Sequence, residues 1–168
     1  MIAKPIQNRL NEQVAVEFGS HYQYLSMAAH FQGQSMGGIS HWFLTQAREE
    51  AGHAMKIYQY VLERGGTAEL AAIPAPKQDW ATVLEAFRDA LAGEQQVSAK
   101  IGTLIDLAKL EKDHATEIFL QWFVTEQVEE ESLVSDAVAQ LELIEDSKVG
   151  LYMFDQKLSE RPAPQPAP

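Results

Sequence analysis

The chain has 168 residues, enough for one domain with a sizeable core, and 46% of them are hydrophobic. Its net charge of −11 argues against binding to nucleic-acid backbones and favours cations or basic partners. The absence of cysteine excludes disulfides, thiolate catalysis and cysteine-ligated metal sites. No apolar run is long enough for a signal peptide or a membrane span, so we expect a cytoplasmic protein with no membrane partner.

Four long helices are predicted, because Gly and Pro cluster at only a few places in the chain. The first covers about residues 5–34, with proline in its first turn, and the second about residues 39–64, ending at two glycines. A connection with two prolines follows, long enough to run the length of a helical bundle. The third helix covers about residues 80–110, and the fourth follows a break at 112–113 and ends near residue 143.

A shorter fifth helix is predicted over about residues 147–158. The long helices should each span about 40 Å. Two antiparallel hairpins joined by a long crossover form one of the known bundle topologies. We therefore predict an all-α protein with a four-helix bundle and short fifth helix over residues 1–160. The sequence after it, 161–168, alternates with proline and is expected to be an extended or flexible tail.

One glutamate lies at the centre of the apolar stripe of each long helix. In the second, third and fourth helices, apolar residues lie 7 and 11 positions on either side of that glutamate. These offsets return to the same helical face. The four residues are Glu17, Glu50, Glu94 and Glu130. No Lys or Arg shares the stripe centres, and an unpaired buried carboxylate is costly. Two divalent cations would neutralise the four acids, so we predict a buried di-metal site rather than a metal-free cluster.

The second helix also carries the motif Glu50-x-x-His53, which places both side chains on one face, one turn apart. Oxygen-rich ligands with one imidazole suit iron or manganese better than zinc in a structural site. The fourth helix has Gln127 where a second such motif would begin, so we expect an asymmetric pair of metals. The first is bound by Glu17, Glu50 and His53, and the second, more weakly, by Glu50, Glu94 and Glu130.

Two further features lie close to this predicted centre. Tyr24 follows Glu17 by two helical turns on the same face, where it can bond a ligand carboxylate, take part in redox chemistry, or do both. A dense acidic run in the fourth helix is either a solvated face or part of a third cation site. Its candidate ligands are Glu49, Glu126, Glu129 and Glu130.

The other histidines are less suited to metal ligation. His41 and His114 fall opposite the apolar stripes of their helices, which predicts surface positions, and His30 lies off the stripe of the first helix. His21 is on that stripe, one turn from Glu17. We expect His21 to be either a core histidine or a residue that supports the ligands, rather than a ligand itself.

Together these residues resemble the ferroxidase centre of the ferritins, and the similarity covers nearly the whole chain. The matching residues are Glu17, Tyr24, Glu50, His53, Glu94, Gln127 and Glu130. The additional Glu49, Glu126 and Glu129 resemble the third iron site of the prokaryotic non-haem ferritins. Bacterioferritins instead carry a haem-binding Met two residues before the histidine of the second helix. That position is Ala51 here, so no haem is expected.

The resemblance implies a ferritin-like bundle that assembles into a homo-oligomeric shell of twenty-four subunits and stores iron as a ferric mineral. It implies that Fe(II) is oxidised to Fe(III) by O₂ or H₂O₂ at a centre holding two irons, with a third iron nearby. Two alternatives remain open. One is a di-iron or di-manganese oxidoreductase without storage, such as a catalase, and the other is a helical assembly that binds no redox metal.

Overall fold

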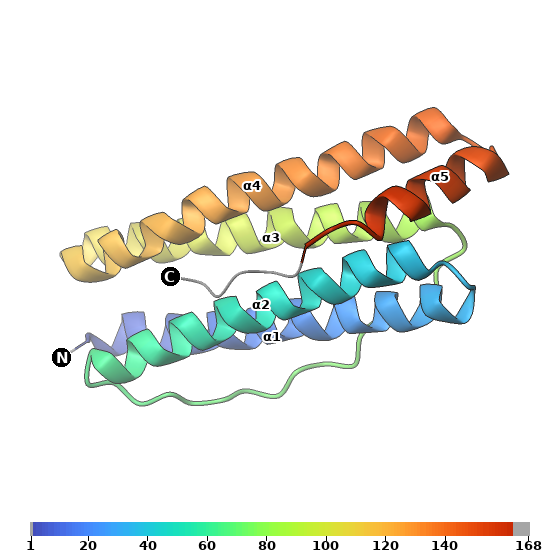
Figure 1. Cartoon of the computed structure of the whole chain (residues 1–168). Helices are drawn as coiled ribbons and strands as arrows, with labels where there is room; N and C mark the ends of the chain where they lie inside the picture. Colours follow the sequence, from blue (N-terminus) through green and yellow to red (C-terminus); the bar gives the residue numbers. More distant parts are fainter. Residues whose placement is uncertain (1, 163–168) are drawn as a thin grey trace.

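The computed structural model describes residues 2–162, which form five helices and no strand. These are α1 (Lys4–Gly33), α2 (Gly37–Glu63), α3 (Val83–Leu110), α4 (His114–Ile144) and α5 (Lys148–Leu158). The first four form two antiparallel hairpins, α1/α2 and α3/α4, that lie against each other as a bundle (Figure 1). The predicted all-α four-helix bundle with a short fifth helix is confirmed. Residues 163–168, most of the predicted tail, lie outside the described residues.

Local signals fix the helix ends close to their predicted positions. The largest difference is at the start of α3, expected near residue 80 and found at Val83. Thr82 caps this helix, because its hydroxyl accepts a hydrogen bond from the backbone N–H of Glu85. The Glu85 carboxylate in turn accepts one from the N–H of Ala81, so the paired caps set the helix start.

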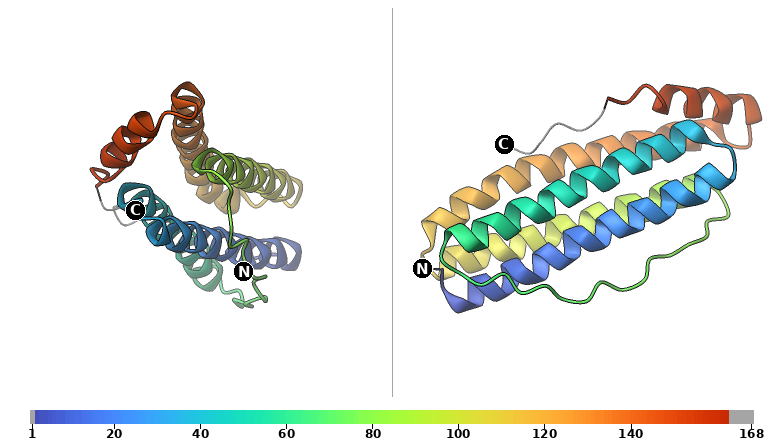
Figure 2. Two further views of the ribbon diagram at one scale, coloured as in Figure 1. Left: turned by 90° about the vertical axis from the view of Figure 1, so that its right-hand side faces the viewer. Right: turned by 60° about the horizontal axis from the view of Figure 1, so that its bottom comes forward.

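The connection between α2 and α3 runs back along α1 for most of its length (Figures 1 and 2). The Asn11 side chain donates to the carbonyl of Thr67, and the Ser26 hydroxyl donates to the carbonyl of Lys77 at 2.7 Å. These bonds satisfy backbone groups that have no helical partner. The long crossover predicted from the two prolines is therefore present, and it lets both hairpins run antiparallel within one bundle.

The hydrophobic core is divided into two clusters by a polar layer. One cluster includes Phe31, Phe43, Phe87 and Val134, and the other includes Leu10, Ile57, Ile101 and Leu120. On each long helix, the stripe-centred glutamate lies between the residues of one cluster and those of the other. The fold therefore brings the four acids to a common depth, closed at both ends by apolar side chains.

Helix α5 packs on the beginning of α2 and the end of α4. The backbone of α5 approaches Gly38 so closely that a Cβ there would lie 1.7 Å from the carbonyl oxygen of Asp155. The Asp155 carboxylate accepts a hydrogen bond from the N–H of Ile39 and thereby caps α2. Phe154 is buried, whereas Val149, Tyr152 and Met153 on the same helix are exposed. None of the helices within residues 2–162 has the length and apolar character needed to cross a membrane.

Candidate metal centre

The four stripe-centred glutamates are almost completely removed from solvent. Glu17 is 0% exposed, Glu50 1%, Glu94 2% and Glu130 5%. Each comes from a different helix, and burial, followed by the charges of the other three, raises the pKa of Glu50. His53 is 3% exposed and follows Glu50 by one turn. The centre is thus a dry layer of carboxyl groups with a single imidazole.

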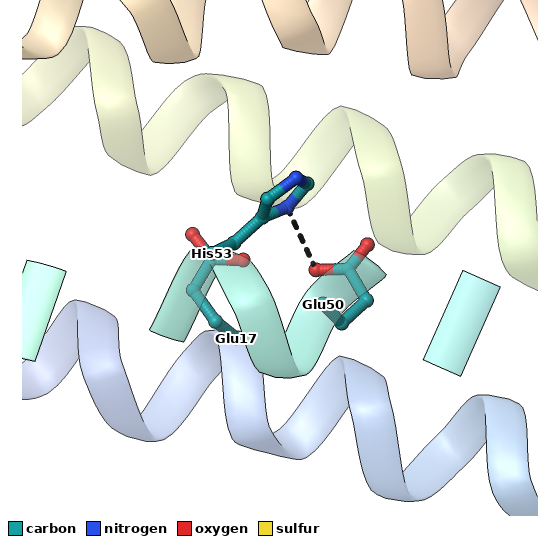
Figure 3. A group of neighbouring side chains, drawn as sticks. All are labelled: Glu17, Glu50 and His53. Carbon is teal, nitrogen blue, oxygen red and sulfur yellow. Dashed lines mark ion pairs between the residues drawn. The ribbon is translucent and has the colours of Figure 1, made fainter. Parts of the chain in front are cut away.

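Glu17, Glu50 and His53 form the first group that could hold a cation (Figure 3). One ligand atom from each lies within 4.8 Å of the others. Nδ1 of His53 is 3.4 Å from Oε2 of Glu50. Both oxygens of Glu50, Oε2 of Glu17 and Nδ1 of His53 are buried without a hydrogen-bond partner. Buried polar atoms without partners are rare and costly, and a divalent cation bound among them would satisfy all four.

His53, Glu126 and Glu130 form a second group with the same spacing. Nε2 of His53 is 3.9 Å from Oε1 of Glu126. The imidazole therefore stands between the two groups, with one nitrogen near each. Glu126 was expected only at the third cation, and here it shares the histidine with Glu130.

Glu94 belongs to neither group among the described residues, and protein donors occupy both of its carboxylate oxygens. The Tyr24 hydroxyl donates to Oε1 of Glu94 at 2.5 Å, and Nε2 of Gln127 donates to Oε2 at 3.2 Å. Glu94 would have to turn away from these partners to bind the second metal proposed for it. Tyr24 and Gln127 thus contact the centre through Glu94.

The two remaining predicted ligands lie farther out. Glu49 forms an ion pair with Arg161, with Oε2 and Nη2 2.8 Å apart. Glu129 is exposed and joins neither group in the part of the chain that is described.

Three supporting residues were missed from the sequence. Gln13 donates to Oε1 of Glu17 at 2.8 Å, and Gln46 donates to Oε2 of Glu130 at 2.6 Å. Gln13 precedes Glu17 by one turn on the same stripe, a signal that could have revealed it. The third is Arg161, which precedes a proline in the predicted tail, and no helical periodicity points to it.

Burial controls the protonation of the centre. It raises the pKa of Glu17 to about 7, an effect that the hydrogen bond from Gln13 partly offsets. It also raises the pKa of Glu130 to about 8, with a further contribution from the charge of Glu94. Burial lowers the pKa of His53 to about 4, and the charge of Lys56 adds to this effect. At neutral pH the imidazole is therefore neutral and ready to bind a metal, whereas a cation must displace protons from the carboxyl groups.

Tyr24 is packed as a core aromatic residue. Its ring stacks on Phe43 with centroids 6.0 Å apart and meets Trp42 edge-on at 6.4 Å. Burial, followed by the charge of Glu94, raises the pKa of Tyr24 well above its usual value. The phenol therefore keeps its proton and remains a donor to Glu94.

The histidines outside the centre bond to backbone groups or face solvent. Nδ1 of His21 is 2.6 Å from the carbonyl oxygen of Ala47, and because a carbonyl only accepts, Nδ1 carries the proton. His114 is exposed, as its position opposite the stripe predicted. His41, for which a surface position was also predicted, is half-buried. Its Nε2 donates to the carbonyl oxygen of Arg161 at 2.9 Å.

Known proteins of similar sequence and structure share this architecture. Residues 7–144 match the family described as a ferritin-like domain. A bacterial non-heme ferritin of Staphylococcus aureus (strain USA300) is 39% identical over 161 residues, which cover 96% of this chain and 97% of the relative. A solved closed form of the Archaeoglobus fulgidus ferritin, engineered by mutagenesis, is 40% identical with a TM-score of 0.96, covering 98% of this chain and 100% of the other. A humanized archaeal ferritin is 41% identical with a TM-score of 0.97 at the same coverage. The chain therefore belongs to the ferritin family, as the resemblance in its sequence predicted.

Proposed function

We propose that this chain is the ferroxidase subunit of an iron-storage shell, with Fe(II) as its substrate. Membership of the ferritin family supports both the oxidation of Fe(II) and iron storage. The observation that carries the proposal for this chain is the cluster of buried, unpartnered ligand atoms on Glu17, Glu50 and His53. Such a cluster is stabilised by a bound cation and is costly without one.

The residues of the centre have distinct tasks in this reaction. Neutral His53 and the carboxylates of Glu17 and Glu50 bind the first Fe(II) ion, and the carboxyl protons leave as it enters. The second Fe(II) ion binds through Glu50, Glu94 and Glu130, with His53 and Glu126 close to the same place. Each ion gives one electron to O₂, which takes up two protons to become H₂O₂; with H₂O₂ as oxidant, two electrons and two protons yield two water molecules.

Carboxylate ligands favour the oxidised product, because Fe(III) carries more charge than Fe(II) and is stabilised more strongly by anionic oxygen. Tyr24 is placed to act on the reaction through Glu94, to which its hydroxyl donates. A third iron would bind in the adjoining acidic cluster formed by Glu49, Glu126, Glu129 and Glu130. The half-buried Glu126 and Glu49, beside buried Glu130, support this part of the proposal.

The assembly part of the proposal is a shell of twenty-four copies that encloses ferric mineral. Exposed apolar residues of α4 and α5 offer surface that subunit contacts could bury. They include Ile118, Val128, Val149, Tyr152 and Met153. The cytoplasmic location expected from the sequence remains part of the proposal.

Aerobic loading with Fe(II), followed by size-exclusion chromatography and iron analysis, tests the function. We expect rapid oxidation, and iron that elutes with a large assembly. Glu50→Gln should abolish the rapid phase, whereas the control Glu142→Gln, which changes an exposed acid on α4, should not. Oxidation by a small species that retains no iron would favour an oxidoreductase without storage. Failure to bind Fe(II) without oxygen would favour a structural assembly.

A further inference from the structure

The chain beyond α5 places one arginine on the acidic edge of the metal centre. After Leu158 the chain continues in the direction of α5 (Figure 1), and the Arg161 side chain contacts Trp42 and Glu49 of α2. Its Nη2 is 2.8 Å from Oε2 of Glu49, and its guanidinium carbon is 5.0 Å from the centroid of the Trp42 ring. The side chain of Arg161 is 16% exposed and that of Glu49 is 21% exposed, so the pair is largely shielded from water.

The backbone of Arg161 is held independently of its side chain. Its carbonyl oxygen accepts a hydrogen bond from Nε2 of His41 at 2.9 Å, and its N–H donates to the carbonyl of Leu158 at 3.3 Å. Pro162 follows and restricts the backbone of the residue before it. The guanidinium can therefore leave Glu49 by side-chain rotation alone, while the segment stays in place.

The Arg161 ion pair differs from the other shielded arginine–carboxylate pair, Arg64–Asp113, in which both Nη atoms of the guanidinium donate hydrogen bonds. Nη1 of Arg161 is buried and has no hydrogen-bond partner, which leaves part of its donor capacity unused. The exposed pairs Arg9–Glu12 and Arg88–Glu142 lie in solvent and are worth little. A shielded guanidinium with an unsatisfied donor makes fewer hydrogen bonds than its burial requires. A divalent cation that binds the carboxylate more tightly could therefore replace it.

The charge of Arg161 acts on two ligands of the proposed third site. It lowers the pKa of Glu49, against a larger increase caused by burial, and it lowers the pKa of Glu130. Both residues belong to the set Glu49, Glu126, Glu129 and Glu130. Arg161 thus supplies, from within the chain, the positive charge that a metal would bring to the same carboxylates.

We propose that Arg161 is a built-in competitor of the third cation, whose guanidinium holds Glu49 and must leave before Glu49 can ligate a metal. This inference rests on the third site of the proposed function. It implies an order of binding, because Glu17, Glu50 and His53 lack such a competitor and fill without displacing a side chain. Arg161 therefore weakens the third site relative to the site of Glu17, Glu50 and His53.

Calorimetric titration of the whole metal-free protein with Zn(II), which is redox-inert, tests the competition. In Arg161→Gln we expect the third class of sites to bind about tenfold more tightly, equivalent to about 1.4 kcal/mol. The first class, bound by Glu17, Glu50 and His53, should not change. Arg161→Lys keeps the charge and should stay close to the native affinity, which separates charge competition from loosening of the segment. Arg88→Gln, the matched control, removes an equal charge from an exposed pair on α3 and should have no effect.

A second arm uses Glu49→Gln, in which the partner of Arg161 is neutral. In this background, Arg161→Gln should no longer produce the tenfold tightening, because the pair between Arg161 and Glu49 is already broken. An unchanged third class in Arg161→Gln alone would overturn the inference, and so would equal tightening by Arg88→Gln. The first two equivalents of Zn(II) report separately on the proposed ferroxidase centre, since native protein that fails to bind them contradicts the function whatever Arg161 does.

Discussion

The Tyr24 hydroxyl and the Glu94 carboxylate are joined by a hydrogen bond of 2.5 Å in the middle of the bundle. Gln127 donates to the other oxygen of Glu94, so both of its oxygens are occupied by protein donors. Both oxygens of Glu50, by contrast, have no donor. Glu50 is open to a metal and Glu94 must first release its partners, so the site built on Glu50 should fill before the one that uses Glu94.

Tyr24→Phe removes the hydroxyl and keeps the ring that packs on Phe43. We expect both irons still to bind, because Tyr24 is not in either ligand group. Oxidation should be slower or altered in its time course, because the donor to Glu94 is lost. Stopped-flow absorbance of Fe(III) measures the rate, and anaerobic Fe(II) titration measures binding. Tyr22→Phe, on an exposed tyrosine of α1, is the control. Loss of all bound iron would make Tyr24 a structural residue only.

Glu50→Gln and His53→Ala should each lower the initial rate of aerobic Fe(II) oxidation at least about tenfold, because each removes a ligand made for the metal. The metal-free Glu50→Gln protein should also melt at a higher temperature than the native one. An amide replaces a carboxyl whose charged form is disfavoured by burial and by the charges of Glu94, Glu17 and Glu130. Stopped-flow kinetics and thermal melts measure the two effects. Initial rates equal to the native rate would show that the assigned site is wrong.

Glu126 and Glu129 should differ in their effects although they lie on the same helix. Glu126→Gln should weaken binding near His53, because Glu126 is part of the second group. Glu129→Gln should leave the first two irons in place and disturb only the third, because Glu129 is exposed. Anaerobic binding stoichiometry distinguishes the two variants. Full occupancy of all three sites in Glu129→Gln would remove Glu129 from the third site.

The stability of the metal-free protein should fall as pH rises from about 6.5 to 8. The pKa of Glu17 is raised from 4.5 to about 7 and that of Glu130 to about 8, so the folded state keeps protons that the unfolded state has lost. Glu17 alone would cost about 3 kcal/mol once both states are deprotonated. The lowered pKa of His53 has the opposite sign, but its effect is complete above its ordinary value of 6.5.

Thermal melts at pH 6.5 and pH 8, with and without Zn(II), measure this dependence. Zn(II) should restore stability at pH 8, because the cation replaces the protons that have been lost. Glu17→Gln should flatten the pH dependence. A melting temperature that rises across this interval in the metal-free protein would contradict the assigned protonation.

The helices and their central acids could be predicted because both depend on local periodicity. The spacing around Glu50 lies within one helix, and the buried position of that residue follows from the stripe it belongs to. Arg161 could not be predicted, because its place on Glu49 depends on how α5 packs against α2. The hydrogen bonds that Glu94 accepts could not be predicted either, since they depend on side-chain rotamers where three helices meet.

The crossover divides the long helices into two hairpins, and the metal centre draws on both. Glu17, Glu50 and His53 come from the first hairpin, and Glu126 and Glu130 come from the second. A cation bound by His53 and Glu130 would therefore link the two hairpins. Emptying the centre removes this link and leaves buried acids that must take up protons, so we expect the iron-depleted subunit to be the form that proteases attack most readily.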